Sequence, residues 1–128
     1  MAAQVIRKSI DQNRAKYAWE YAEESKSKAF KEKYKSHVRE FPMLVLTCGL
    51  VNAVAFANEK GESDGGWKLL YGHLEKWLKI DSGQTVLNFD SNGLLPALLT
   101  ITPTDIQKMR FLANETISLF TWLKRFVS

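Results

Sequence analysis

The feature that most constrains the fold is a long apolar segment near the middle of the chain, from Pro42 to Asn58. It is far longer than the roughly 4–8 residues of a buried strand. It is also shorter than the ~20 apolar residues that a membrane-spanning helix needs. Proline suits the first position of a helix, and the residue before proline avoids the α conformation. The segment therefore predicts a helix that begins at Pro42 and, being apolar on nearly all sides, lies fully buried at the centre of the protein.

Helical patterns account for most of the remaining chain. They cover about residues 3–25, 28–40, 67–78, 94–99 and 102–127, and a short apolar piece at 86–89 has no clear type. In the last segment Thr102 suits the cap, Pro103 the first position and Asp105 the third, near the positive end of the helix dipole. We predict an all-α protein, a compact bundle of about five to six helices in one domain over residues 1–128.

Residue types that carry out chemistry are few and dispersed. His37 and His73 lie in separate helical segments, and no Cys/His or HExxH pattern is present, so we expect no metal site. We expect His37 to face solvent and Cys48, the single cysteine, to be an inert buried thiol. No nucleophile with its base can be assembled, so we expect no catalytic residue, no cofactor and no enzyme activity. The first residues lack the apolar core of a signal peptide, and we expect a cytoplasmic protein with no membrane partner.

The net charge of +4 is concentrated in the first third of the chain. Residues 1–40 hold ten Lys and Arg against six Asp and Glu, whereas residues 41–128 hold eight of each. Such asymmetry indicates an anionic partner, or a solvated face that keeps the protein soluble. Basic residues that could follow a phosphate backbone are Arg14, Lys16, Lys33, Lys35, Arg39, Arg110, Lys124 and Arg125. We interpret the neighbouring tyrosines and the four tryptophans as core or interface residues rather than base-stacking platforms.

Several blocks occur in an order that resembles a known family. They are Asn13–Ala18, Lys33–Val38, Phe41–Leu50, Ala53–Phe56, Trp77–Leu78, Asp105–Arg110 and Glu115–Phe126. In this order they resemble the small subunit of the type III-B CRISPR–Cas effector, the Cmr complex. The strongest are the block from Pro42 to Leu50 and the closing Trp122–Phe126. Cys48 departs from the pattern, because asparagine is expected before the Gly-Leu pair.

The resemblance implies an all-helical subunit with no catalysis of its own. Its partners would be other Cmr subunits, further copies of itself stacked along the complex, and the backbones of guide RNA and target RNA. The matching basic positions, Arg14, Lys16, Lys33, Lys35, Arg110, Lys124 and Arg125, are the expected phosphate contacts. Reversing the charges of Arg14 and Lys16 together is expected to weaken RNA retention without unfolding the protein. Two alternatives stay open: a helical adaptor that binds only protein, and a small nucleic-acid enzyme.

Overall fold

The described part of the chain is built from helices. The computed structural model describes residues 2–78, 93–99, 101 and 105–127, with side chains from residue 12 onward. The helices are α1 (Ala2–Lys26), α2 (Lys31–Cys48), α3 (Leu50–Lys60), α4 (Gly65–Trp77), α5 (Leu94–Leu99) and α6 (Ile106–Val127). They pack compactly and no strand occurs within these ranges, so the predicted all-α class is confirmed.

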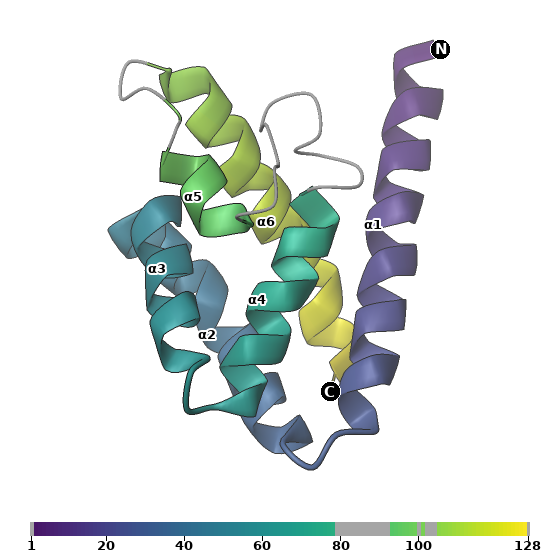
Figure 1. Ribbon diagram of the computed structural model, residues 1–128. Coiled ribbons are helices and arrows are strands. Elements are labelled where there is room, and N and C mark those ends of the chain that lie inside the picture. Colours follow the sequence, from purple (N-terminus) through teal and green to yellow (C-terminus); the bar gives the residue numbers. More distant parts are fainter. Residues whose placement is uncertain (1, 79–92, 100, 102–104, 128) are drawn as a thin grey trace.

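Helix α6 organises the bundle. Both α1 and α2 pack along it, α4 packs against α2, and α5 contacts α3 (Figure 1). Helices α1 and α6 run in the same direction, and α2 runs opposite to them, as Figure 1 shows. The C-terminal ends of α1 and α6 therefore meet at the same end of the molecule.

Aromatic side chains form the centre of the core. The rings of Phe41 on α2 and Phe120 on α6 are 5.1 Å apart, and both side chains are fully buried. Tyr34 and Trp77 are buried equally deeply. Burying a side chain of this size contributes roughly 1.5–3 kcal/mol, so these contacts hold α2, α4 and α6 together.

The prediction of one fully buried helix beginning at Pro42 is wrong. Helix α2 runs through Pro42 and ends at Cys48, and Gly49, with φ 86°, separates it from α3. Proline removes one backbone donor from a helix, but Pro42 is itself buried, and the core packing on that face of α2 holds the helix through it. Met43 and Leu46 are 62% and 67% exposed, because they lie on the side of α2 turned away from Phe41.

Two aspartates mark helix starts that the sequence placed elsewhere. Helix α4 begins at Gly65, before the predicted start at residue 67, because Asp64 caps it: its Oδ1 accepts hydrogen bonds from the backbone N–H groups of Gly66 (2.8 Å) and Trp67 (3.3 Å). Asp105, expected inside the last helix, precedes it, and its Oδ1 accepts from the N–H of Lys108 at 3.2 Å. The predicted cap at 102–103 and the apolar piece at 86–89 lie outside the described residues.

Candidate nucleic-acid interface

Arg14 joins α1 to α6. Its Nη2 lies 2.6 Å from Oε1 of Glu115 and its Nε donates to Oε2 at 3.2 Å, a two-pronged ion pair. The side chains are only 19% and 10% exposed. The planar guanidinium matches a carboxylate in this arrangement better than an ammonium would. Arg14, one of the predicted phosphate contacts, therefore has a structural partner within the chain.

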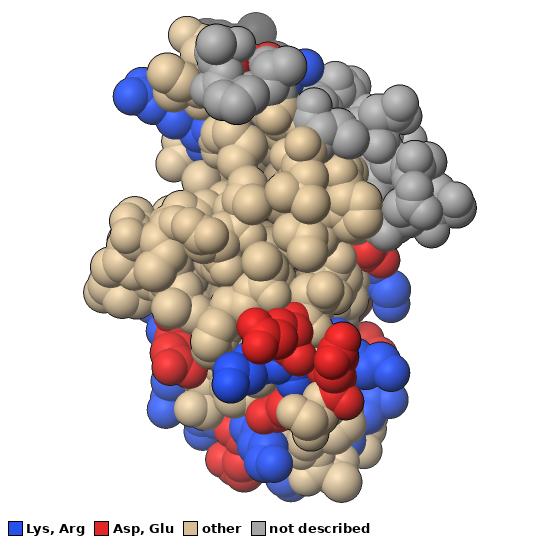
Figure 2. Space-filling view, turned by 60° about the vertical axis from the view of Figure 1, so that its left-hand side comes forward, with Lys and Arg blue, Asp and Glu red and all other residues tan. Residues whose placement is uncertain are grey.

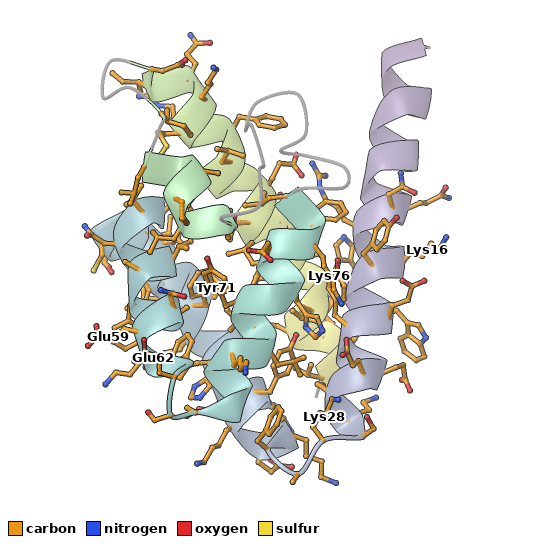
Figure 3. All side chains as sticks on the ribbon, in the orientation of Figure 1. Lys16, Lys28, Glu59, Glu62, Tyr71 and Lys76 are labelled. Carbon is orange, nitrogen blue, oxygen red and sulfur yellow. The ribbon has the colours of Figure 1, made fainter. Side chains whose placement is uncertain are left out.

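Lys16 lies on the side of α1 opposite to Arg14. It is exposed and points away from the bundle (Figure 3). Glu20 and Glu23 follow it at spacings of four and seven, on the same side of the helix. The structure therefore separates Lys16 from Arg14, although the two are close in sequence.

The predicted bases of α2 alternate with acids. Lys35 and Arg39 lie one turn apart and line a shallow hollow with Glu32, Ser36 and Glu40. Lys33 is exposed on the same helix. Acidic and basic side chains likewise intermingle over the lower part of the face shown in Figure 2, below a broad uncharged area. Mixed charge of this kind attracts phosphate weakly, because the acids oppose it.

Helix α6 carries the most uniform basic surface. Its exposed residues Arg110, Asn114, Thr121 and Arg125 recur at spacings of four, seven and four, and exposed Lys124 lies beside them. The single acid of the helix, Glu115, is held by Arg14. From Arg110 to Arg125 the helix rises about 22 Å. We call this surface the α6 strip: Arg110, Asn114, Thr121, Lys124 and Arg125.

The eight predicted contacts do not form one patch. Arg110, Lys124 and Arg125 share the α6 strip, and Lys33, Lys35 and Arg39 share α2, which packs against α6. Arg14 is ion-paired and Lys16 points outward. The α6 strip is therefore the strongest candidate surface for phosphate among the described residues.

Comparison with known families matches residues 10–128 to "CRISPR-associated protein (Cas_Cmr5)". This match covers nearly the whole chain, including every predicted basic residue. The chain belongs to the Cas_Cmr5 family. It is thus a CRISPR-associated Cmr small subunit of type III-B systems, and other Cmr subunits are its partners.

The resemblance blocks of this Cas_Cmr5 protein fall at structural junctions. The block from Pro42 to Leu50 contains the Gly49 break between α2 and α3. The block Trp122–Phe126 forms the end of α6, where it meets α1. Cys48, expected to be buried, is exposed at the last position of α2, because the helix break turns that end of α2 toward solvent.

Sequence reasoning missed an aromatic group at this same end of the Cas_Cmr5 chain. Trp19 is 51% exposed, and its ring lies 5.3 Å from that of Phe126. Phe126 in turn stacks on the half-buried Trp122 at 5.9 Å. The sequence hints at this surface only in the spacing of four between Trp122 and Phe126, because the contact with Trp19 is set by the packing of α1 on α6.

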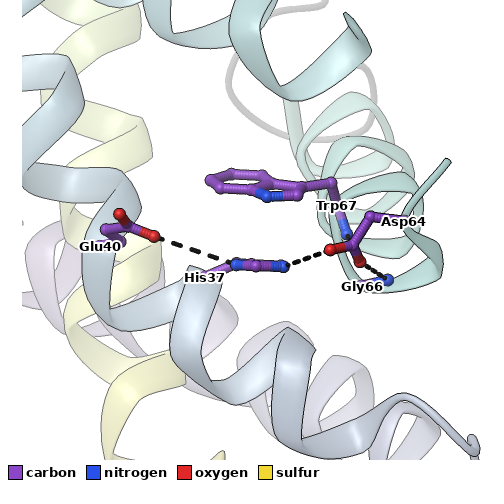
Figure 4. A network of polar contacts seen from close by, with 5 residues as sticks. All are labelled: His37, Glu40, Asp64, Gly66 and Trp67. Carbon is purple, nitrogen blue, oxygen red and sulfur yellow. Dashed lines mark hydrogen bonds and ion pairs between the residues drawn. The ribbon is translucent and has the colours of Figure 1, made fainter. Parts of the chain in front are cut away.

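His37 is part of a structural contact between α2 and α4. Its ring stacks on Trp67 at 4.1 Å, its Nε2 donates to Oδ2 of Asp64 at 3.1 Å, and Oε2 of Glu40 lies 4.0 Å from Nδ1 (Figure 4). The prediction that His37 faces solvent is wrong, because this stacking covers the ring. Although burial opposes ionisation of Asp64, the hydrogen bonds from His37 and from the Gly66 and Trp67 amides lower its pKa.

His73 connects three helices in the core. Its Nε2 donates to Oε1 of Glu24 on α1 at 2.7 Å, because a carboxylate can only accept, and its Nδ1 accepts from the hydroxyl of Tyr34 on α2, also at 2.7 Å. Burial lowers the pKa of His73 and raises that of Tyr34 well above its usual value, while the hydrogen bond from His73 lowers the pKa of Glu24. Tyr34 is fully buried, so this set holds the helices and is closed to a substrate.

The described residues contain no group of three or more His, Cys, Asp or Glu able to hold a metal ion. Within the same residues, no helix is both long enough and apolar enough to span a membrane.

Proposed function

We propose that this Cmr small subunit is a non-catalytic RNA-contacting element of a type III-B effector, working in the cytoplasm in antiviral defence. The observation that carries the proposal is the α6 strip, where three cations lie along about 22 Å of helix and the only acid of α6 is neutralised by Arg14. Cations on such a surface attract guide and target RNA through their phosphates, whatever the base sequence.

The contacts of the two histidines support a non-catalytic role. The two histidines of the described residues are engaged in helix contacts, through Asp64 for His37 and through Glu24 and Tyr34 for His73. A general base needs a substrate within hydrogen-bond reach, and His73 is 1% exposed. Bond cleavage in the effector is therefore assigned to other subunits.

Exposed apolar side chains support contacts with other subunits or with further copies of this one. Met43 and Leu46 on α2 and Leu99 on α5 are each more than half exposed, and Phe56 on α3 adds to them. Exposed apolar surface is typical of protein interfaces. The same observation favours the second candidate function, an adaptor that binds only protein, in which the basic residues serve solubility.

An RNA gel-shift assay on the purified chain separates the two functions. We expect the double variant Lys124→Glu, Arg125→Glu to bind single-stranded RNA at least tenfold more weakly, since two phosphate contacts are lost and two repulsions are added. The matched control, Lys60→Glu with Lys68→Glu, makes the same change in net charge on exposed residues of α3 and α4.

Equal RNA binding by both double variants would contradict a role for the α6 strip. No RNA binding by the wild-type chain or by its reconstituted Cmr complex, with subunit association intact, would favour the adaptor. Cleavage of the RNA by the purified chain with added divalent metal would contradict the non-catalytic role.

A further inference from the structure

A partly exposed aromatic cluster lies where α1 meets the end of α6. We call it the aromatic ridge: Trp19, Trp122 and Phe126. Phe126 contacts both indoles, edge to face with Trp19 at 5.3 Å and stacked with Trp122 at 5.9 Å. Trp19 is 51% exposed, whereas the core indoles of Trp67 and Trp77 are 4% and 1% exposed. A half-exposed indole in contact with other aromatic rings is typical of a binding surface.

A cation accompanies each indole of the ridge. Nζ of Lys26 lies 5.6 Å from the ring centre of Trp19, and the guanidinium of Arg125 lies 5.2 Å from that of Trp122. Arg125 also belongs to the α6 strip, so the ridge continues the basic surface. Glu23 lies beside Lys26, with its Oε1 3.4 Å from Nζ, in an exposed pair that water screens.

This combination has the chemistry of a site for single-stranded nucleic acid. Such sites pair aromatic faces, on which bases stack, with cations that hold the adjoining phosphates. The centres of protein–protein interfaces also contain tryptophan and arginine, but lysine is depleted there. The position of Lys26 over Trp19 therefore favours a polyanion that carries aromatic rings over a protein partner.

We propose that the aromatic ridge stacks an unpaired base of RNA, with Lys26 and Arg125 contacting its flanking phosphates. This inference rests on the proposed RNA-contacting function and adds a preference that backbone contacts alone cannot give. A base inside a duplex is already stacked and cannot reach an indole, so the ridge distinguishes unpaired RNA from paired RNA.

The test uses the full chain and two probes, a short mixed-sequence RNA single strand and a duplex containing that strand. We expect Trp19→Ala to weaken single-strand binding about tenfold, as for the loss of one stacked base. Trp19→Phe is expected to keep most of the affinity, and duplex binding is expected to be the same in both variants. Single-stranded RNA is expected to quench tryptophan fluorescence in the wild type and much less in Trp19→Phe. Because Trp19 is half exposed, circular dichroism is expected to show a folded protein in each case.

The outcomes separate this inference from the function on which it rests. Unchanged single-strand binding by Trp19→Ala, with loss of binding by the Lys124→Glu, Arg125→Glu variant, would overturn the ridge and leave the α6 strip. Equal loss of single-strand and duplex binding would overturn stacking. Loss of Cmr-subunit or self-association with RNA affinity unchanged would make the ridge a protein interface. Absence of any RNA binding by the wild type at low salt would overturn both proposals.

Discussion

Reversing the charge of Arg14 is expected to destabilise the fold, whereas the same change at Lys16 is not. In Arg14→Glu a second carboxylate faces Glu115, whose side chain is 10% exposed and loses both hydrogen bonds from the guanidinium. Breaking a fully buried pair by removing one partner costs about 3–5 kcal/mol. Arg14 keeps some solvent contact, so we expect a loss of about 2–3 kcal/mol in the free energy of unfolding.

Urea denaturation followed by circular dichroism measures this difference. Lys16→Glu is the matched control, because Lys16 is exposed on the same helix, and its stability is expected to stay within about 0.5 kcal/mol of wild type. The exchanged pair Arg14→Glu, Glu115→Arg is expected to recover part of the loss. Equal unfolding free energies for the Arg14→Glu and Lys16→Glu variants would refute the conclusion that the Arg14–Glu115 ion pair stabilises the packing of α1 on α6. From the sequence, reversing the charges of Arg14 and Lys16 together was expected to leave the fold intact. The ion pair of Arg14 with Glu115 instead predicts that the double reversal is destabilising.

Three further outcomes follow from the helix contacts. Because the folded pKa of His73 is below its ordinary 6.5 and that of Glu24 is below its ordinary 4.5, the unfolded chain binds more protons at acid pH. The free energy of unfolding measured by urea denaturation is therefore expected to fall as pH drops, below about 6.5 for His73 and below about 4.5 for Glu24, by up to about 1.4 kcal/mol per pH unit for each group, and a flat profile would contradict this. Tyr34→Phe leaves the buried Nδ1 of His73 without its donor and is expected to cost about 1–3 kcal/mol; thermal melts matching wild type would show the bond to be unimportant. Gly49→Ala is expected to lower the free energy of unfolding by about 1–3 kcal/mol, because the φ of Gly49 is 86°. Gly72→Ala, in helix α4 with open space at Cβ, is expected to raise it by about 0.5–1 kcal/mol. A change of the same sign in both variants would contradict the backbone conformation at these two positions.

Most of the helices could be predicted from the sequence, because their apolar residues repeat at helical spacing. The junction at 41–50 could not. Local preference places a helix start at Pro42, but the buried side chains of Phe41 and Val45 on either side carry α2 through it. The break falls instead at Gly49, whose positive φ shows only in the folded backbone. The exposure of Met43 likewise depends on which side of α2 packs against α4 and α6, and the composition of the segment does not reveal that.

The individual bases of the candidate site could be predicted, and their environments could not. Nothing local marks Arg14 as different from Lys16, since the partner of Arg14 is 101 residues away. The spacing along α6 did identify the stripe that begins at Arg110, because a helix face is a local property. Trp19 was expected in a core or interface, and only the packing of α1 on α6 shows it half exposed beside Phe126.

The salt dependence of RNA binding tests the central claim most directly. Three phosphate contacts through the α6 strip predict that the logarithm of the binding constant falls with the logarithm of salt concentration with a slope of about −2 for single-stranded RNA. Neutralising two of them, by Lys124→Gln with Arg125→Gln, is expected to reduce the slope to about −0.7. A slope that is the same in this variant and in the wild type would contradict the account.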